Sequence, residues 1–271
     1  MIKTAICNEL FGKMSFQESC DLTAAYGFGG IEIAPFTLFG DVSSIPPDTI
    51  TMIKNALNNS GLEFAGLHWL FVKPENLHIT SPDKLTRERS WDHLKRLLSL
   101  AGELGGGNLT LGSPKQRIAA DISITEALDY MEEGLAGVAD IAADCDSIVC
   151  IEALASADTN VINTLKESNK MIQRVGRNSI SGMFDFHNCG DETDGWAELI
   201  KKNKSIIKHV HLNTTEGGHP NSMDTDKYSE SFSVLKDINY NGWVSLEIFT
   251  IPENPEQVLS ETAAFLKGMP F

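Results

Sequence analysis

Short apolar runs alternate with longer amphipathic stretches along the chain, a pattern typical of a parallel sheet with crossover helices. Eight of these runs have the near-continuous apolar character expected of strands that are buried on both faces. They comprise residues 3–10, 30–35, 63–70, 108–113, 147–154, 179–186, 206–213 and 243–249. The sequence therefore predicts eight buried strands.

Each run is followed by a stretch with helical spacing, and several of these stretches begin with Ser, Pro or Asp and end with Gly. The predicted helices lie within residues 15–27, 47–61, 81–106, 123–144, 159–176, 194–205, 226–242 and 252–268. Neither a linker nor a low-complexity block separates the units. We therefore expect a single domain over residues 1–271.

Eight strand–helix units can form either a closed barrel or an open, doubly wound sheet. An open sheet of this kind is expected to carry a G-x-G-x-x-G motif directly after an early strand. The only triple glycine, at 105–107, precedes a strand instead. A length of 271 residues also suits one (β/α)8 barrel, which usually needs about 250. The prediction is an α/β fold, a single TIM barrel.

Charge and cysteine content narrow the choice of partners. The net charge of −15 repels polyanions, so nucleic acid is not expected as a partner. Five scattered cysteines without C-x-x-C spacing indicate reduced thiols. The N-terminal residues do not resemble a signal peptide, and no apolar run approaches the roughly 20 residues of a membrane helix. We expect a soluble, cytoplasmic protein without a membrane partner.

The carboxyl ends of the predicted strands are rich in acidic and imidazole side chains, and this is the end where barrel enzymes place their catalytic residues. An ionised carboxylate that faces a barrel interior is costly unless it is paired or binds a metal. No Lys or Arg occupies the matching positions, which favours a metal. The residues at these ends are Glu32, His68, Glu152, Asp185, His187, His209, His211 and Glu247.

Four short segments at these strand ends match a known family. They are IEAL at 151–154, FDFHN at 184–188, HVHLN at 209–213 followed by GGHP at 217–220, and GWVSLEIF at 242–249. Together they resemble the xylose isomerase-like sugar isomerases and epimerases, in particular the D-tagatose 3-epimerase-like branch. The resemblance extends over the whole chain.

The resemblance implies one divalent metal ion, Mn²⁺ or alternatively Mg²⁺ or Co²⁺, held by Glu152, Asp185, His211 and Glu247. It also implies that Glu152 and Glu247 act as acid and base on opposite faces of a small sugar. The expected enzyme is an isomerase that moves a proton through a metal-stabilised cis-enediolate. Epimerisation of a ketose and aldose–ketose isomerisation both fit this chemistry.

Several further residues are predicted to contact the substrate, namely His187, His68, Trp69, Asp158, Ser113, Lys115, Arg117 and Glu32. The Ser, Lys and Arg belong to the loop GSPKQR after the fourth strand, which could bind an anionic group on the sugar. Glu32 has structural hydrogen bonding as an equal alternative, and His209 is expected in the core. The stretch after His211 carries Gly217 and Gly218 where related epimerases have an arginine, so the sugar is not specified.

Other functions remain open at this stage. A keto-cyclitol dehydratase, or an eliminase that acts on a 3-keto sugar or glycoside, would use the same metal site. An abasic-site endonuclease shares this barrel but needs additional His and Asp ligands, and it is disfavoured by the negative charge. A non-catalytic sugar-binding barrel is a further alternative. A homo-oligomer, dimer or tetramer, is compatible with the sequence.

Overall fold

Eight parallel strands pair in chain order, and the first strand pairs with the last, so that the sheet closes into a barrel. The computed structural model describes residues 2–270. The strands are β1 (Lys3–Cys7), β2 (Gly30–Ile33), β3 (Glu63–Leu67), β4 (Asn108–Leu111), β5 (Ile148–Ile151), β6 (Ile180–Asp185), β7 (Ile207–Leu212) and β8 (Trp243–Leu246). In β2, β4, β6 and β8 every residue is buried, which explains their continuous apolar sequences.

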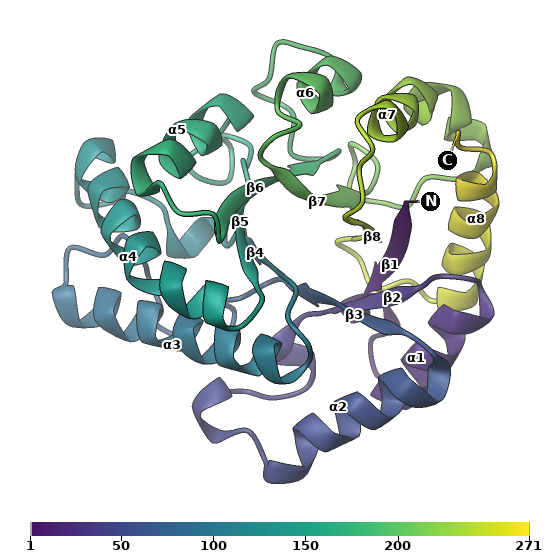
Figure 1. The fold of residues 1–271 in the computed structure, drawn as a ribbon, viewed down its shortest axis with the longest axis horizontal. Coiled ribbons are helices and arrows are strands. Elements are labelled where there is room, and N and C mark those ends of the chain that lie inside the picture. The colour runs from purple at the N-terminus through teal and green to yellow at the C-terminus, as the bar shows by residue number, and fades with distance from the viewer. Residues whose placement is uncertain (1, 271) are drawn as a thin grey trace.

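Helices follow the strands and form a ring outside the barrel (Figure 1). They are α1 (Phe16–Ala25), α2 (Pro47–Ser60), α3 (Lys84–Glu103), α4 (Ile124–Asp144), α5 (Leu165–Val175), α6 (Trp196–Lys202), α7 (Thr225–Asp237) and α8 (Pro255–Lys267). The predicted (β/α)8 TIM barrel is thus confirmed. None of these helices is long and apolar enough to cross a membrane.

Local signals explain where helices begin. Ser15 and Glu18 form a reciprocal capping box at the start of α1, and Thr164 and Glu167 do the same for α5. The second capping box also explains a difference from the sequence prediction, which began this helix at residue 159. The side chain of Asn163 donates hydrogen bonds to backbone oxygens before the cap, so residues 159–163 remain a loop.

Short 3-10 helices follow β1, β2 and β4 at the carboxyl end of the barrel, namely η1 (Asn8–Phe11), η2 (Pro35–Thr37) and η4 (Pro114–Gln116). Two others, η3 (Val42–Ser44) and η5 (Ser222–Asp224), precede α2 and α7. The predicted strands extended up to three residues beyond the observed ends, because residues such as Ala153 and Leu154 are apolar and buried although the chain has already left the sheet. These segments surround the site described next.

Candidate metal centre and active-site cavity

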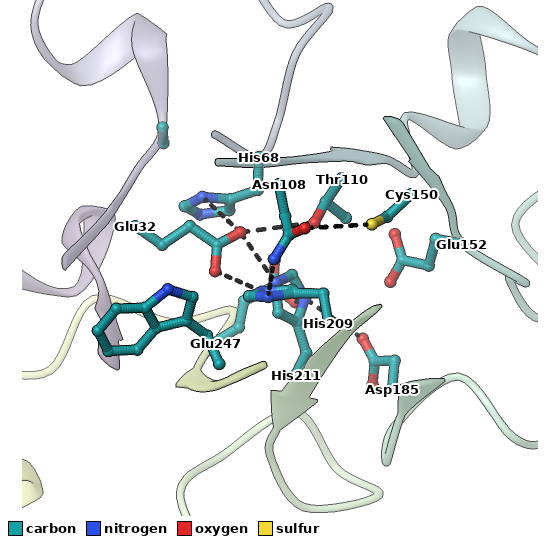
Figure 2. A network of polar contacts seen from close by, with 12 residues as sticks. Glu32, His68, Asn108, Thr110, Cys150, Glu152, Asp185, His209, His211 and Glu247 are labelled. Atoms are coloured by element: carbon teal, nitrogen blue, oxygen red, sulfur yellow. Dashed lines mark hydrogen bonds and ion pairs between the residues drawn. The ribbon is translucent and has the colours of Figure 1, made fainter. Parts of the chain in front are cut away.

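Four buried side chains converge at the carboxyl end of the barrel. Glu152 directly follows β5, Asp185 ends β6, His211 lies near the end of β7, and Glu247 directly follows β8. One potential ligand atom from each lies within 4.8 Å of the corresponding atoms of the other three. Figure 2 shows this group beside the polar side chains of the barrel interior. The structure therefore brings together all four residues that were predicted to bind a metal.

The two ring nitrogens of His211 have different surroundings. Nε2 lies 3.2 Å from Oε1 of Glu32, within hydrogen-bonding distance. Nδ1 lies 2.9 Å from Oε2 of Glu247 and 3.8 Å from Oδ2 of Asp185. It is nevertheless buried without a hydrogen-bond partner among the described residues. A proton on Nε2, donated to Glu32, leaves the lone pair of Nδ1 directed toward the carboxylates, as a metal ligand requires.

Asn188 connects two of the carboxylates. Its Nδ2 donates to Oε1 of Glu152 and to Oδ2 of Asp185, both at 3.1 Å. The backbone N–H groups of His187 and Asn188 donate to Oδ1 of Asp185 at 2.7 and 3.2 Å. Sequence analysis assigned no role to Asn188, although it belongs to the FDFHN segment. These bonds orient the carboxylates but bring no positive charge.

The cluster therefore holds three carboxylates and one imidazole. No Lys or Arg within residues 2–270 forms an ion pair with any of the three. Burial and the nearby charges of Asp185 and Glu247 raise the pKa of Glu152 well above its usual range. Burial opposes ionisation of Asp185 too, but the nearby imidazole of His211 and the backbone N–H of His187 outweigh it and lower the pKa to about 2. An oxygen-rich donor set with excess negative charge fits a hard divalent cation.

A second polar group, which we call the inner layer, lies deeper in the barrel and comprises Glu32, Asn108 and His209. Oε2 of Glu32 lies 2.7 Å from Nε2 of His209, and Nδ2 of Asn108 lies 3.3 Å from the other ring nitrogen (Figure 2). Burial would raise the pKa of Glu32, but His209 and His211 hold it well below the usual range. Glu32 is fully buried and does not line the cavity, which favours the alternative of structural hydrogen bonding over substrate contact.

A cavity of about 300 Å³ opens above the four converging side chains. Glu152 and Glu247 both line it. Five predicted substrate contacts line it as well, namely His68, Trp69, Ser113, Asp158 and His187. Sequence analysis missed the other lining residues, which are Thr110, Gly112, Pro114, Leu154, Asn188 and Phe249. Most of these lie just beyond a strand end, which was the one signal available for them.

His68 is held from the side of β1. Its Nε2 lies 2.7 Å from Oε2 of Glu9, in η1, which sequence analysis did not identify. Its ring meets that of His211 edge to face, with centroids 5.9 Å apart. The next residue, Trp69, has a φ of 51°, an unusual conformation for a bulky side chain. Such backbone outliers cluster at functional sites, where the surrounding structure supports them.

The two cations of the loop after β4 lie away from the cavity lining. Arg117 is fully buried, and its guanidinium donates to the backbone oxygens of Leu111, Glu152 and Ile162 at 3.2, 2.8 and 3.2 Å. It therefore supports the loops rather than the substrate. Lys115 is exposed and does not line the cavity. These positions do not support the prediction that the two cations bind an anionic group on the sugar, since the sequence does not show where each side chain points.

Comparison with known proteins places the chain in a family. Residues 20–269 match the family model described as xylose isomerase-like TIM barrel. The chain belongs to this family. The solved structure of 3-keto-D-glucoside 4-epimerase from E. coli, in its apo form, superposes with a TM-score of 0.83 at 21% identity, covering 98% of this chain and 99% of that one. This likeness shows a shared fold.

Curated relatives agree with the family assignment. D-psicose 3-epimerase of Agrobacterium fabrum is 28% identical over 83% of this chain and 76% of its own length. The 3-dehydro-D-guloside 4-epimerase of Escherichia coli is 24% identical over 64% of this chain and 69% of its own. These relatives are epimerases, and they confirm both the predicted resemblance and the predicted enzyme class, isomerase.

Proposed function

We propose that this protein is a metal-dependent epimerase that inverts a carbon next to the carbonyl group of an uncharged keto-sugar. The observation that carries the proposal is the position of Glu152 and Glu247. Both carboxylates line the cavity, and both belong to the cluster with Asp185 and His211. The epimerase names of the curated relatives support the same reaction class.

A divalent metal fits the four converging residues, and Mn²⁺ is our first choice because the donor set is mostly carboxylate. Glu152, Asp185, Glu247 and Nδ1 of His211 would hold it. The lone pair on that nitrogen has no partner within residues 2–270, and none of the three carboxylates forms an ion pair with a Lys or Arg side chain of this part of the chain. When bound, the metal would polarise the carbonyl group of the sugar and stabilise negative charge on its oxygens.

The two glutamates would move the proton. They come from β5 and β8, which stand three positions apart around the ring, so their carboxylates reach the cavity from different sides. One carboxylate takes the proton from the carbon beside the carbonyl group, and the electron pair of that bond moves into an enediolate. The other returns a proton to the opposite face of the same carbon, which inverts it.

The charges around the cavity favour a neutral sugar. Among the described residues, none of the side chains that line it belongs to Lys or Arg, whereas Glu152, Asp158 and Glu247 are acidic. A phosphate or carboxylate group would lose its hydration there without gaining a Lys or Arg partner. Hydroxyl groups, in contrast, find acceptors on these carboxylates and on His187.

The test is deuterium exchange. The Mn²⁺-loaded protein is incubated in heavy water with a panel of neutral ketohexoses and keto-hexosides, and the products are analysed by NMR. We expect an epimer that carries one deuterium at the inverted carbon, and no exchange with Glu247→Gln. An aldose product would indicate isomerisation instead, and loss of water would indicate the dehydratase or eliminase alternative. Exchange with none of the sugars would reject the proposal.

A further inference from the structure

A second cavity of about 360 Å³ lies beside the first, and the proposed proton transfer does not use it. The two cavities share Trp69 and Phe249 as lining residues. The second is completed mainly by residues from η1 and η2 and from the loop after β8, including Glu9, Phe36 and Ile251. It is therefore adjacent to the site that would hold the keto-sugar, with Trp69 and Phe249 between the two.

The rim of this second cavity exposes large apolar side chains. Phe36 is 38% exposed, Phe249 43% and Ile251 63%. Grouped exposure of this kind leaves apolar surface in water and is typical of a binding site. Because the three residues come from loops that follow β2 and β8, their proximity is a product of the fold and not of neighbouring sequence.

The shared aromatic wall is held in place by specific features. The backbone N–H of Phe249 donates to the oxygen of Gly217 at 3.0 Å, and the ring packs edge to face with His187, with centroids 4.7 Å apart. Gly217 has a φ of 79°, and a Cβ atom there would lie 2.3 Å from Cδ2 of Phe249. Glycine at 217 thus makes room for this ring, which a larger residue such as arginine would displace.

The chemistry of the second cavity favours an uncharged ring. Aromatic and aliphatic side chains predominate, and they suit the apolar face of a sugar ring or the face of an aryl group. Among the described residues that line it, Glu9 is the only charged one, so an anionic substituent is disfavoured. The first cavity alone lies at the lower end of the range of about 300–1,000 Å³ that is usual for small-molecule sites.

We propose that the second cavity is a subsite for an uncharged ring, a sugar or an aryl group, joined to the keto-sugar through a glycosidic oxygen. The substrate would then be a glycoside and not a free ketose. Because a glycoside has its anomeric carbon locked, its carbonyl group must stand at another ring carbon, such as C3. This inference rests on the proposed function for the neighbouring cavity.

The experiment compares methyl, phenyl and glucosyl 3-keto-hexosides as substrates for the Mn²⁺-loaded protein, by deuterium exchange. We expect kcat/KM to be about tenfold or more higher for phenyl or glucosyl than for methyl, a modest gain for one stacked ring. The phenyl and glucosyl arms distinguish the two kinds of ring. In Phe36→Ala and in Ile251→Ser, the ratio of kcat/KM for the phenyl or glucosyl substrate to that for the methyl substrate should fall toward one. Met223→Ala is the matched control, because Met223 is 87% exposed and lines neither cavity.

A second measurement separates this inference from the proposed function. Calorimetric titration with methyl and phenyl glucosides, which carry no keto group, reports the subsite without the reaction. Tighter binding of the phenyl compound, lost in Phe36→Ala, supports the subsite even if no sugar exchanges deuterium. Equal binding and equal kcat/KM for all substituents overturn it. A wild-type dimer that Ile251→Ser dissociates would also overturn it, since the rim would then be a contact between copies.

Discussion

The inner layer and the cluster above it place carboxylates in the same barrel but neutralise them differently. In the inner layer, the Glu32 carboxylate lies within hydrogen-bonding distance of two imidazoles, those of His209 and His211. In the upper cluster, none of the three carboxylates forms an ion pair with Lys or Arg within residues 2–270, and the nearby Nδ1 of His211 makes no hydrogen bond there. His209 and His211 lie two residues apart on one strand, yet the first is satisfied by protein groups and the second is not.

This difference teaches how to distinguish a structural from a functional buried charge. Burial of an ionised group is costly unless protein partners compensate for it. Where partners are complete, as around Glu32, the group contributes to a defined barrel interior. Where they are incomplete and the same atoms line a cavity, the missing partner comes from outside the chain. Variants of the two regions should therefore fail in different ways.

The largest effect is expected at Arg117, which is fully buried and, like the inner layer, is compensated by hydrogen bonds to protein groups. Arg117→Ala removes three charge-assisted hydrogen bonds and leaves a buried cavity. We expect a loss of at least about 3 kcal/mol in the free energy of unfolding. Thermal or urea unfolding measures this loss.

Lys115→Ala is the control for Arg117→Ala. Lys115 lies in η4, next to this arginine, but its side chain is exposed, so the change in stability should stay within about 0.5 kcal/mol. A stable Arg117→Ala protein with a strongly raised KM would show instead that this arginine contacts the substrate.

The next effect concerns the upper cluster. Glu152→Gln and Glu247→Gln each keep the size of the side chain but cannot carry the proton. We expect kcat to fall by at least about 10²-fold in each variant while the barrel stays folded. The double variant should lose little more than either single variant, because each interrupts the same relay. Steady-state kinetics with measured metal content checks this. Near wild-type turnover by either metal-loaded variant would contradict the two-glutamate mechanism.

Sequence reasoning recovered the backbone and the upper cluster for a physical reason. Strand burial gives continuous apolar runs, and parallel strands bring their carboxyl ends to one rim, so Glu152, Asp185, His211 and Glu247 could be grouped from their positions in the sequence. Each lies within one residue of its strand's end or beyond it. The pattern identifies which residues reach the rim, but not how the loops continue.

The side-chain positions that the sequence does not reveal lie mostly in those loops. Arg117 turns inward after Ser113, whose φ of 49° redirects the chain in a way that residue types alone do not reveal. Asn188 contacts Glu152, 36 positions away in sequence, and Glu9 contacts His68, 59 positions away. Such pairings depend on loop conformation and register, for which hydrophobic spacing carries no information. The positions at the strand ends were predictable, whereas the hydrogen bonds that join distant loops around the cavity were not.

A smaller effect links the two regions through His211. Glu32→Gln removes the negative charge that faces Nε2, so the orientation and basicity of Nδ1 are less well fixed. Groups that orient a metal-bound histidine typically affect metal affinity by about 10–100-fold. We expect the Kd for Mn²⁺, measured by calorimetry, to rise by about tenfold. The control is Thr110→Ser. The Thr110 hydroxyl makes only a long contact of 3.5 Å to the Glu32 carboxylate, so this change should leave the Kd for Mn²⁺ nearly unchanged. An unaltered Kd in Glu32→Gln would show that the layers are independent.

The smallest effect is a gain in stability and tests the comparison most directly. Without metal, the Glu152 carboxyl faces Asp185 and Glu247, and the side-chain amide of Asn188 donates a hydrogen bond to it. Glu152→Gln keeps an acceptor for that amide and removes the like-charge repulsion, so the chelated variant should be more stable than the chelated wild type by about 1 kcal/mol. That corresponds to roughly 2–4 °C in Tm for a domain of this size. Added Mn²⁺ should raise Tm in the wild type more than in the variant, because a ligand stabilises only the state that binds it. Glu32→Gln, in contrast, should lower Tm under the same metal-free conditions, since its partners are already complete. If both variants shift Tm in the same direction in chelator, the two layers do not differ in how their charges are compensated.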